Sequence, residues 1–459
     1  MREALFRAAQ HSSWVANEES VAQRQSERTT RQIYERSALP LPKPATQGWT
    51  GGSASPGVTL LWPYPRGSSD VIDRANCADL FLRAHPRFRI VTEYGLDRGA
   101  LAETDPAENI LLFCPFDAVL PRLSITADSL LTVDDRPVHA VASEMIMGYL
   151  MRAGLWPKPA RGADFAHLPA IDRLRTGLVN GTGLALFKAA QMALFQRRRD
   201  SLSGLGVTMP QGRVAWDRAE AVAASEAWFA QGHGVVYRPF ASSRGTAVSF
   251  LGPRGSQPRR RAVEEVLDAM EATMADTYGR ADPYPITLST FVESRKIDGR
   301  VCDLRMFVVA DPQASALRAI PGAVGLAQIP FGERDELGTA TCLTNLNAPP
   351  DAEAVPIPRE LPLSDPDVLA VLGIGEKELE LLGRVAVLLW SRAVTAERVT
   401  TGMALPFAYG SVDFLITETG RIAPIEMNGA NVGSHTSVHP LFLDSFGLAM
   451  RAALEEALW

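Results

Sequence analysis

The chain has 459 residues, which predicts two or three domains, because single hydrophobic cores stop growing at about 250–300 residues. Hydrophobic residues make up 46% and charged residues 21%, as in ordinary globular proteins. The net charge of −6 argues against a nucleic acid as the main partner, since phosphate binding needs a basic excess. The polar N-terminus resembles no signal peptide, and no apolar run reaches the roughly 18–20 residues of a membrane helix. We therefore expect a cytoplasmic protein without a membrane partner.

The first third of the chain predicts a linker followed by a small α/β domain. Within 1–55 we expect a helix over 16–36, followed by a stretch rich in Pro, Gly and Ser that is a linker or an extended wrap over the surface. Between 56 and 165, apolar runs alternate with helical spacing, which predicts parallel strands. We expect strands over 58–64, 88–95 and 109–116, and a helix over 70–84. No G-x-G-x-x-G follows the first strand, so a dinucleotide is not indicated there.

The rest of the chain, 166–459, predicts a larger mixed domain. Residues 140–200 have a largely helical pattern, and 311–360 are expected to be rich in loops. The strands are expected over 234–240, 286–294 and 300–310, and 241–250 is expected to be a small-residue turn that leads back into a strand and so forms a hairpin with 234–240. The helices are expected over 184–199, 217–231, 261–278, 376–394 and 440–458. The four cysteines include no CxxC pair, so a zinc site is not expected.

A β-hairpin is predicted near the C-terminus, over 410–428. Two apolar-rich strands flank the sequence ETGR, which has the composition of a tight turn. A tip at Thr419-Gly420 pairs Glu418 with Arg421.

Counting back from that tip places Asp413 directly opposite Glu426, with Asn428 on the same face. Facing carboxylates repel each other, and a divalent cation removes this repulsion. Carboxylate and amide oxygens suit Mg²⁺, with phosphate oxygens completing its shell. The alternative is a solvated polar face in which an arginine such as Arg421 pairs with one carboxylate.

An Asp on one strand, followed by Glu-x-Asn on the next and a Gly-containing loop, resembles the metal-binding end of the ATP-grasp superfamily. The resemblance covers roughly 166–459 and implies an ATP-grasp catalytic domain with a smaller lid subdomain at about 212–295. The segment 56–165 is similar to the α/β pre-ATP-grasp domain that precedes it in this superfamily. Asp413, Glu426 and Asn428 would then hold Mg²⁺ (or Mn²⁺) that accompanies ATP.

The same resemblance implies nucleotide-binding residues upstream. The segment VVYRPFASSRGTAV (235–248) takes the place of the family's Gly-rich hairpin over the phosphates. Arg238 stands where a lysine is usual, although a permanently charged arginine also suits phosphate. An ordinary turn and a solvent-facing Lys188 are the alternatives. The residues implied to bind ATP are Lys188, Arg238, Ser242, Ser243, Arg244, Gly245 and the hinge acid Glu293.

Substrate residues are implied more loosely. The sequence DLR (303–305) resembles an Asp-x-Arg strand of several ATP-grasp carboxylate ligases, with Asp303 and Arg305 on one face. Arg318 is expected on the next strand, and Arg305 and Arg318 would hold the carboxylate and its acylphosphate as catalytic residues. The alternatives are a structural Asp–Arg pair and a surface arginine. Asn431 and His435, in the loop after the hairpin, are the candidates near the acceptor.

The resemblance implies an ATP-dependent ligase that activates a carboxylate as an acylphosphate and joins it to an amine. An amino acid or a small peptide in a biosynthetic pathway is the expected substrate class, by analogy with the peptide ligases of specialised metabolism. Three alternatives stay open: loading of an amino acid onto a carrier-protein thiol, phosphotransfer without ligation, and regulation by ATP binding without turnover. A homodimer and a carrier-protein partner are compatible with the resemblance.

Overall fold

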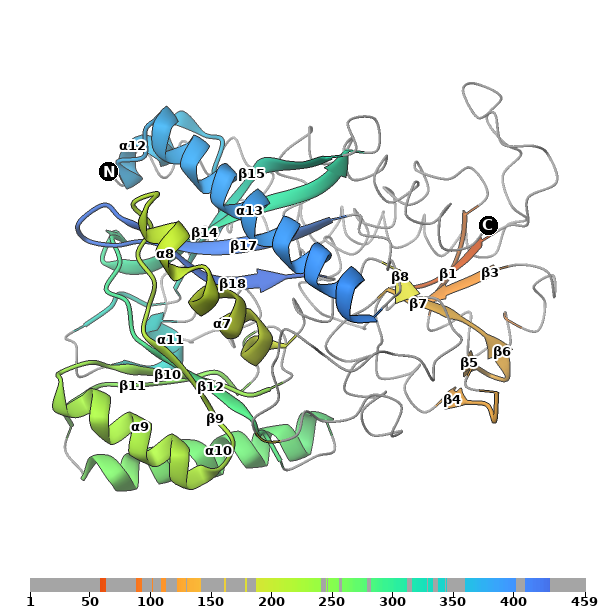
Figure 1. The fold of residues 1–459 in the computed structure, drawn as a ribbon, viewed down its shortest axis with the longest axis horizontal. Coiled ribbons are helices and arrows are strands. Elements are labelled where there is room, and N and C mark those ends of the chain that lie inside the picture. The colour runs from red at the N-terminus through yellow and green to blue at the C-terminus, as the bar shows by residue number, and fades with distance from the viewer. Residues whose placement is uncertain are drawn as a thin grey trace, which may run out of the picture.

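The computed structural model describes the chain in separate ranges, and the structural statements below refer to them. They are 58–62, 88–92, 101, 109–112, 122–128, 130–141, 161, 178–179, 187–240, 245, 247–255, 258–278, 282–311, 316–327, 329–332, 337–342, 344, 360–401 and 409–429. Within these ranges, strands form four β-sheets, and helices pack against two of them (Figure 1). The predicted α/β class is confirmed. The helices predicted over 16–36, 70–84 and 440–458 lie outside the described residues.

The N-terminal sheet is parallel, as its alternating apolar runs predict. Its order is β2 (Phe88–Thr92), β1 (Val58–Trp62), β3 (Asn109–Leu112), β7 (His139–Val141) and β8 (Leu178–Val179). A small antiparallel sheet that the sequence does not predict contains β4 (Leu123–Ile125), β5 (Leu131–Val133) and β6 (Arg136–Pro137). The expectation that 140–200 is largely helical is wrong at β8, a strand that pairs with β7.

A four-stranded antiparallel sheet forms next, with two helices packed against it. Its order is β11 (Ser249–Leu251), β10 (Val235–Arg238), β12 (Ile286–Thr290) and β9 (Gly212–Ala215), and the helices are α9 (Arg218–Ala230) and α10 (Arg259–Tyr278). Asp217 caps α9 by accepting the N–H of Glu220, while Glu220 accepts the N–H of Trp216. The apolar sides of Trp228, Leu267 and their neighbours fill the space between helices and sheet.

The central sheet carries the predicted hairpin. Its order is β16 (Glu360–Pro362), β15 (Ala316–Leu326), β14 (Arg300–Asp311), β17 (Tyr409–Ile416) and β18 (Ile422–Asn428), and β13 (Lys296–Ile297) pairs with β14. One face of this sheet is covered by α13 (Glu376–Thr401), which follows α12 (Pro366–Leu372) (Figure 1). The fully buried Trp390 of α13 donates its indole N–H to the carbonyl of Ser411, 3.1 Å away. Gly410 leaves room for that ring, because a Cβ there would overlap it.

Two predicted features of the central region differ in the structure. The segment 311–360, expected to be rich in loops, begins with the strand β15 and contains the short helix α11 (Thr339–Cys342), while the strand expected to carry Arg318 is confirmed as β15. Pro321 and Gly322 interrupt the strand pattern of β15, and the sheet accommodates them with a register shift opposite Arg305. The strand predicted over 286–294 ends at Thr290.

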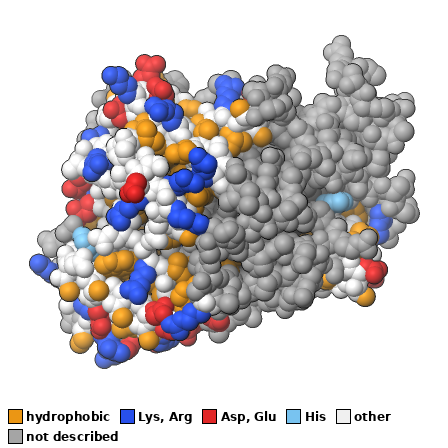
Figure 2. Space-filling model, in the orientation of Figure 1, with side chains coloured by type: hydrophobic (Ala, Val, Ile, Leu, Met, Phe, Trp, Pro, Cys, Tyr) orange, Lys and Arg blue, Asp and Glu red, His pale blue; other side chains and the backbone are white. Residues whose placement is uncertain are grey.

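On the face drawn in Figure 2, Lys and Arg side chains are interspersed with Asp and Glu over the described part of the chain. None of the helices in the described ranges is both long and apolar enough to cross a membrane.

Candidate functional site

The hairpin of β17 and β18 forms with the pairing that the sequence predicts at its far end. Asp413 pairs with Glu426, and Ser411 pairs with Asn428. The turn, however, differs from the predicted one. The N–H of Thr417 bonds to the carbonyl of Arg421, so Glu418 lies in the loop and does not pair with Arg421.

A β-bulge restores the predicted register within the hairpin. Near the turn, Phe414 pairs with Pro424, so the strands are offset by one residue from the prediction. Ile425 is the extra residue between Pro424 and Glu426, and it shifts the pairing back. The bulge therefore places the Glu426 side chain on the same face as Asp413.

Arg305 is the main partner of Asp413. Its Nε donates to Oδ1 at 2.7 Å and its Nη2 donates to Oδ2 at 2.8 Å, a two-pronged ion pair. The amide Nδ2 of Asn428 also donates to Oδ2, at 2.9 Å. The Asp413 side chain is 5% exposed and that of Arg305 is 21% exposed, so solvent screens this pair weakly. The alternative of an arginine partner is thus realised by Arg305 and not by Arg421.

Lys188 is the partner of Glu426. It begins α7 (Lys188–Arg197), is buried, and donates from Nζ to Glu426 Oε1. One turn later, the buried Gln191 donates to the carbonyl of Met427 at 2.6 Å and accepts its N–H at 3.0 Å. Gln191 therefore holds α7 against the edge strand β18, which places Lys188 over Glu426. The solvent-facing alternative for Lys188 is wrong.

Charges from three elements converge on Glu426. Burial alone would raise the pKa of this carboxyl, but the positive charges of Lys188, Arg238 and Arg305 hold it below its ordinary value. Burial lowers the pKa of Arg238 at the end of β10, and the charges of Glu426 and Asp413 oppose that shift. Arg238 also donates to Ser289 Oγ at 3.3 Å. The end of the four-stranded sheet and the central hairpin therefore share one site.

Asp303 adds a third carboxylate to this site. Burial and the neighbouring Asp413 charge raise its pKa to about 7, while Arg305 and a hydrogen bond from Thr344 act in the opposite direction.

Asp303 should give the stability of the protein a pH dependence. The pKa of Asp303 is about 4 in the unfolded chain and about 7 in the folded protein. At a pH between these two values, Asp303 is protonated in the folded protein and ionised in the unfolded chain. The free energy of unfolding contributed by this group is therefore greatest below about pH 4 and falls as the pH rises through about 7. Urea unfolding across this range should show that Asp303→Asn removes part of the decline. Parallel declines in wild type and variant would contradict the assignment.

Glu293 lies in the connection between two sheets. Phe291 donates its N–H to Gly234 beside the four-stranded sheet, and Arg295 donates its N–H to Ile416 of β17 at 2.7 Å. Glu293 is half-buried between these two anchors. Its position agrees with a hinge, whereas its contact with a nucleotide stays a prediction.

Some predicted site residues are not brought together. Arg318 is exposed on β15 and pairs with Val309 of β14. Val309 is four residues beyond Arg305, so Arg318 lies about 13 Å along the strand from Arg305. Gly245 lies in the turn between β10 and β11 with a φ of 73°, which suits glycine. The predicted residues Ser242, Ser243, Arg244, Asn431 and His435 lie outside the described residues.

The side chains fit a hard cation by their chemistry. Among the described residues, no group of three His, Cys, Asp or Glu side chains is already arranged around a metal position. Asp413, Glu426 and Asn428 nevertheless supply carboxylate and amide oxygens of the kind that Mg²⁺ prefers. The hydroxyl of Ser411, fully buried on the same face, has no hydrogen-bond partner in the described part of the chain. A cation at these oxygens would replace Arg305 or Lys188 as their counter-charge.

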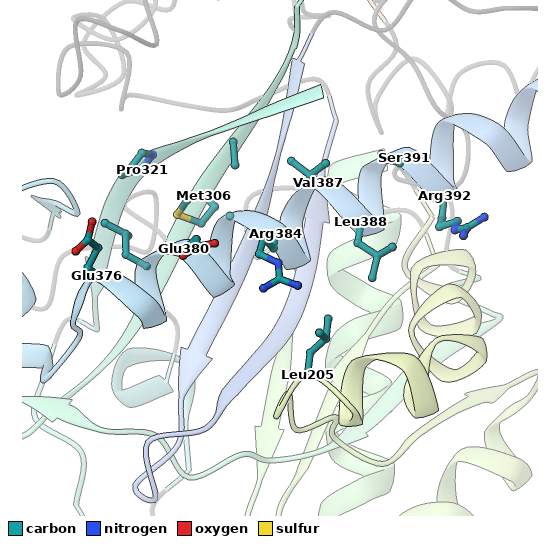
Figure 3. Close-up of a pocket in the computed structure, with 13 residues that line it drawn as sticks. Leu205, Met306, Pro321, Glu376, Glu380, Arg384, Val387, Leu388, Ser391 and Arg392 are labelled. Carbon is teal, nitrogen blue, oxygen red and sulfur yellow. The ribbon is translucent and has the colours of Figure 1, made fainter. Parts of the chain in front are cut away.

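A separate hollow lies on the face of the central sheet that α13 covers, opposite to the face with Asp413 and Arg305. It has a volume of about 870 Å³ between α13, β14 and β15, with Leu205 closing one side (Figure 3). Met306 lines it, and successive strand residues point to opposite faces, so Arg305 points away from this hollow. None of the predicted site residues lines it.

Sequence reasoning missed Gln191 and gave Asp303 no role in the site. Gln191 carried a usable signal, since it is a polar residue one turn after Lys188 within the apolar run from Ala189 to Phe195. Ser289 and Ser411 carried none, because small hydroxyl residues are common in strands of every kind.

No protein-family model matches the sequence, and no curated protein matches it significantly. Among solved structures, D-alanyl-alanine synthetase A from Vibrio cholerae is similar with a TM-score of 0.44 and 11% identity, over 88% of this chain and 100% of that chain. D-cycloserine synthetase DcsG is similar with a TM-score of 0.43 and 14% identity, over the same shares of the two chains, 88% and 100%. Because both TM-scores are below 0.5, the proposal below depends on the side chains described above.

Proposed function

We propose that this chain is an ATP-grasp ligase that uses ATP and Mg²⁺ to activate a carboxylate as an acylphosphate and join it to an amine. The observation that carries the proposal is the convergence of Lys188, Arg238 and Arg305 on Asp413 and Glu426. Three cations facing two carboxylates would accept a polyphosphate together with its metal. The domain division at about 165, the lid at 212–295 and the ATP-binding role of each residue belong to this proposal.

The metal would be held by Asp413, Glu426 and Asn428. When bound, it would supply charge neutralisation to the phosphate oxygens. Lys188 and Arg238 would neutralise the phosphate tail from α7 and from the end of β10. Glu293 would lie beside the base at the connection between the sheets. Ser242, Ser243, Arg244 and Gly245 would cover the phosphates.

The reaction needs positioning and charge neutralisation more than covalent help from the protein. A carboxylate oxygen attacks the γ-phosphorus, and the bond from that phosphorus to the β-phosphate oxygen breaks, which releases ADP. The amine nitrogen then attacks the acyl carbon, inorganic phosphate leaves, and the nitrogen loses a proton. Arg305 would stabilise negative charge in both steps, since its guanidinium lies on the same face as Asp413. Arg318 pairs with Val309, about 13 Å along β14 from Arg305, so its catalytic role is the weaker part of this proposal.

The substrates proposed are a small-molecule carboxylate and an amine, of the amino-acid or short-peptide class. Asn431 and His435 remain the candidates for the acceptor pocket.

Purified full-length protein with Mg-ATP and a pool of amino acids and short peptides should release ADP and phosphate, with a new amide detectable by mass spectrometry. ATP binding without ADP under any of these conditions would favour the regulatory alternative. ADP only in the presence of a carrier protein would favour thioester formation, and a phosphorylated product without an amide would favour simple phosphotransfer.

A further inference from the structure

The site contains one arginine between two carboxylates. Arg305 binds Asp413 through both of its oxygens, and it also attracts Asp303 electrostatically. Asp303 and Arg305 are two residues apart on β14, so their side chains leave the strand on the same face.

Metal binding at Asp413 would take away this bidentate partner of Arg305. A largely buried guanidinium whose carboxylate is withdrawn is strongly destabilised unless another negative group takes over. Asp303 is the carboxylate already in place on the same strand and face.

Two features hold Asp303 in that position. It pairs with Gly325 across the strands β14 and β15, and a Cβ at Gly325 would lie 2.5 Å from Asp303 Oδ1. The carboxylate therefore occupies the space that a side chain at 325 would fill. Thr344 also forms a side-chain hydrogen bond with Asp303. The half-buried carboxylate of Asp303 is thus held by the space that Gly325 leaves and by the hydrogen bond with Thr344.

We propose that Asp303 is a positioning residue that receives Arg305 when a metal ion binds Asp413. This exchange would keep the Arg305 guanidinium on the face of the sheet that carries Asp413, directed toward the proposed phosphates, after Asp413 has bound the metal. This inference rests on the proposed metal site at Asp413, and it adds to the proposed function a residue that acts through Arg305.

The test is Mn²⁺ binding to the full chain without nucleotide, measured by the loss of the free Mn²⁺ signal in electron paramagnetic resonance. Arg305→Met should raise Mn²⁺ affinity by about tenfold, because Asp413 no longer has to exchange a cation. Asp303→Asn should lower Mn²⁺ affinity. The factor by which it lowers the affinity should be about tenfold smaller when Arg305 is already replaced by methionine. The measurement is made about one unit above the pKa of Asp303, so that its carboxylate is ionised.

Gly325→Ala provides a variant that keeps every charge. Its methyl group should displace the Asp303 carboxylate and lower Mn²⁺ affinity by about fivefold in the wild-type background but by less than about twofold beside Arg305→Met. Asp311→Asn, at the far end of the same strand, is the matched control and should leave Mn²⁺ affinity unchanged. Thermal unfolding of each variant with and without Mn²⁺ reports whether it is folded.

The proposal would be overturned if Asp303→Asn and Gly325→Ala each lowered Mn²⁺ affinity as much in the Arg305→Met background as in the wild-type background. Asp303 would then act as a metal ligand or by its charge alone, and not through Arg305. Absence of Mn²⁺ binding by the wild type would overturn both this role and the metal site. The expected coupling together with no ADP release from any carboxylate and amine would retain the role of Asp303 and reject the ligase.

Discussion

Replacing Asp413 with asparagine is expected to lower the free energy of unfolding by about 3–5 kcal/mol and to reduce ATP-dependent ADP release by about a hundredfold or more. Asp413 accepts hydrogen bonds from Arg305 and Asn428 and is 5% exposed. An asparagine amide would turn one acceptor into a donor that faces these N–H groups. Urea unfolding and a coupled ADP assay measure the two effects.

A double variant separates structure from function at Asp413. Arg305→Met with Asp413→Asn removes both members of the buried pair, and such replacements are often close to neutral in stability. We expect the double variant to regain much of the lost stability while ADP release stays low. Recovery of activity together with stability would show that Asp413 has only a structural role.

The second large effect is expected for Lys188→Met, which leaves Glu426 without its lysine partner. The Lys188 side chain is 4% exposed and that of Glu426 is 26% exposed, so we expect a loss of about 2 kcal/mol at neutral pH, less than for a fully buried pair. Nucleotide affinity should also fall by about tenfold or more, because a cation is removed from the proposed phosphate site. Denaturant unfolding and equilibrium binding of a fluorescent ATP analogue measure the two effects.

The stability loss in Lys188→Met should itself depend on pH. The pKa of Glu426 is held below its ordinary value, so its stabilising contribution is present above about pH 4.3 and is lost as the pH falls through the lowered pKa. The difference between variant and wild type should therefore shrink in acid. Lys296→Met removes an exposed pair with Glu418 and should change stability by less than about 1 kcal/mol. Equal effects of the two lysine variants would contradict a special role for Lys188.

The hairpin shows how far sequence reasoning extends at this site. Counting from the turn predicts the Asp413–Glu426 pairing correctly, although the turn is one residue away from the predicted place. Two differences cancel, because the bulge at Ile425 compensates for the altered turn. Pro424 was the available signal, since a proline within a strand favours an edge or a bulge, and β18 is an edge strand.

Long-range placements were harder to predict than strands and helices. Apolar periodicity locates α9, α10 and β14, because local patterns determine them. It cannot reveal that Lys188 meets Glu426, since that contact spans 238 positions and depends on Gln191 at the edge of β18. The Arg305–Asp413 pair follows from the β14–β17 register, which a single sequence does not fix.

The structure of the full chain with a non-hydrolysable ATP analogue and Mg²⁺ will show whether the hairpin forms an ATP site. We expect phosphates between Lys188 and Arg238, a metal ion bound by Asp413, Glu426 and Asn428, and Arg305 moved from Asp413 toward Asp303. A nucleotide bound elsewhere, or an unchanged Arg305–Asp413 pair with no metal at the hairpin, would contradict this expectation.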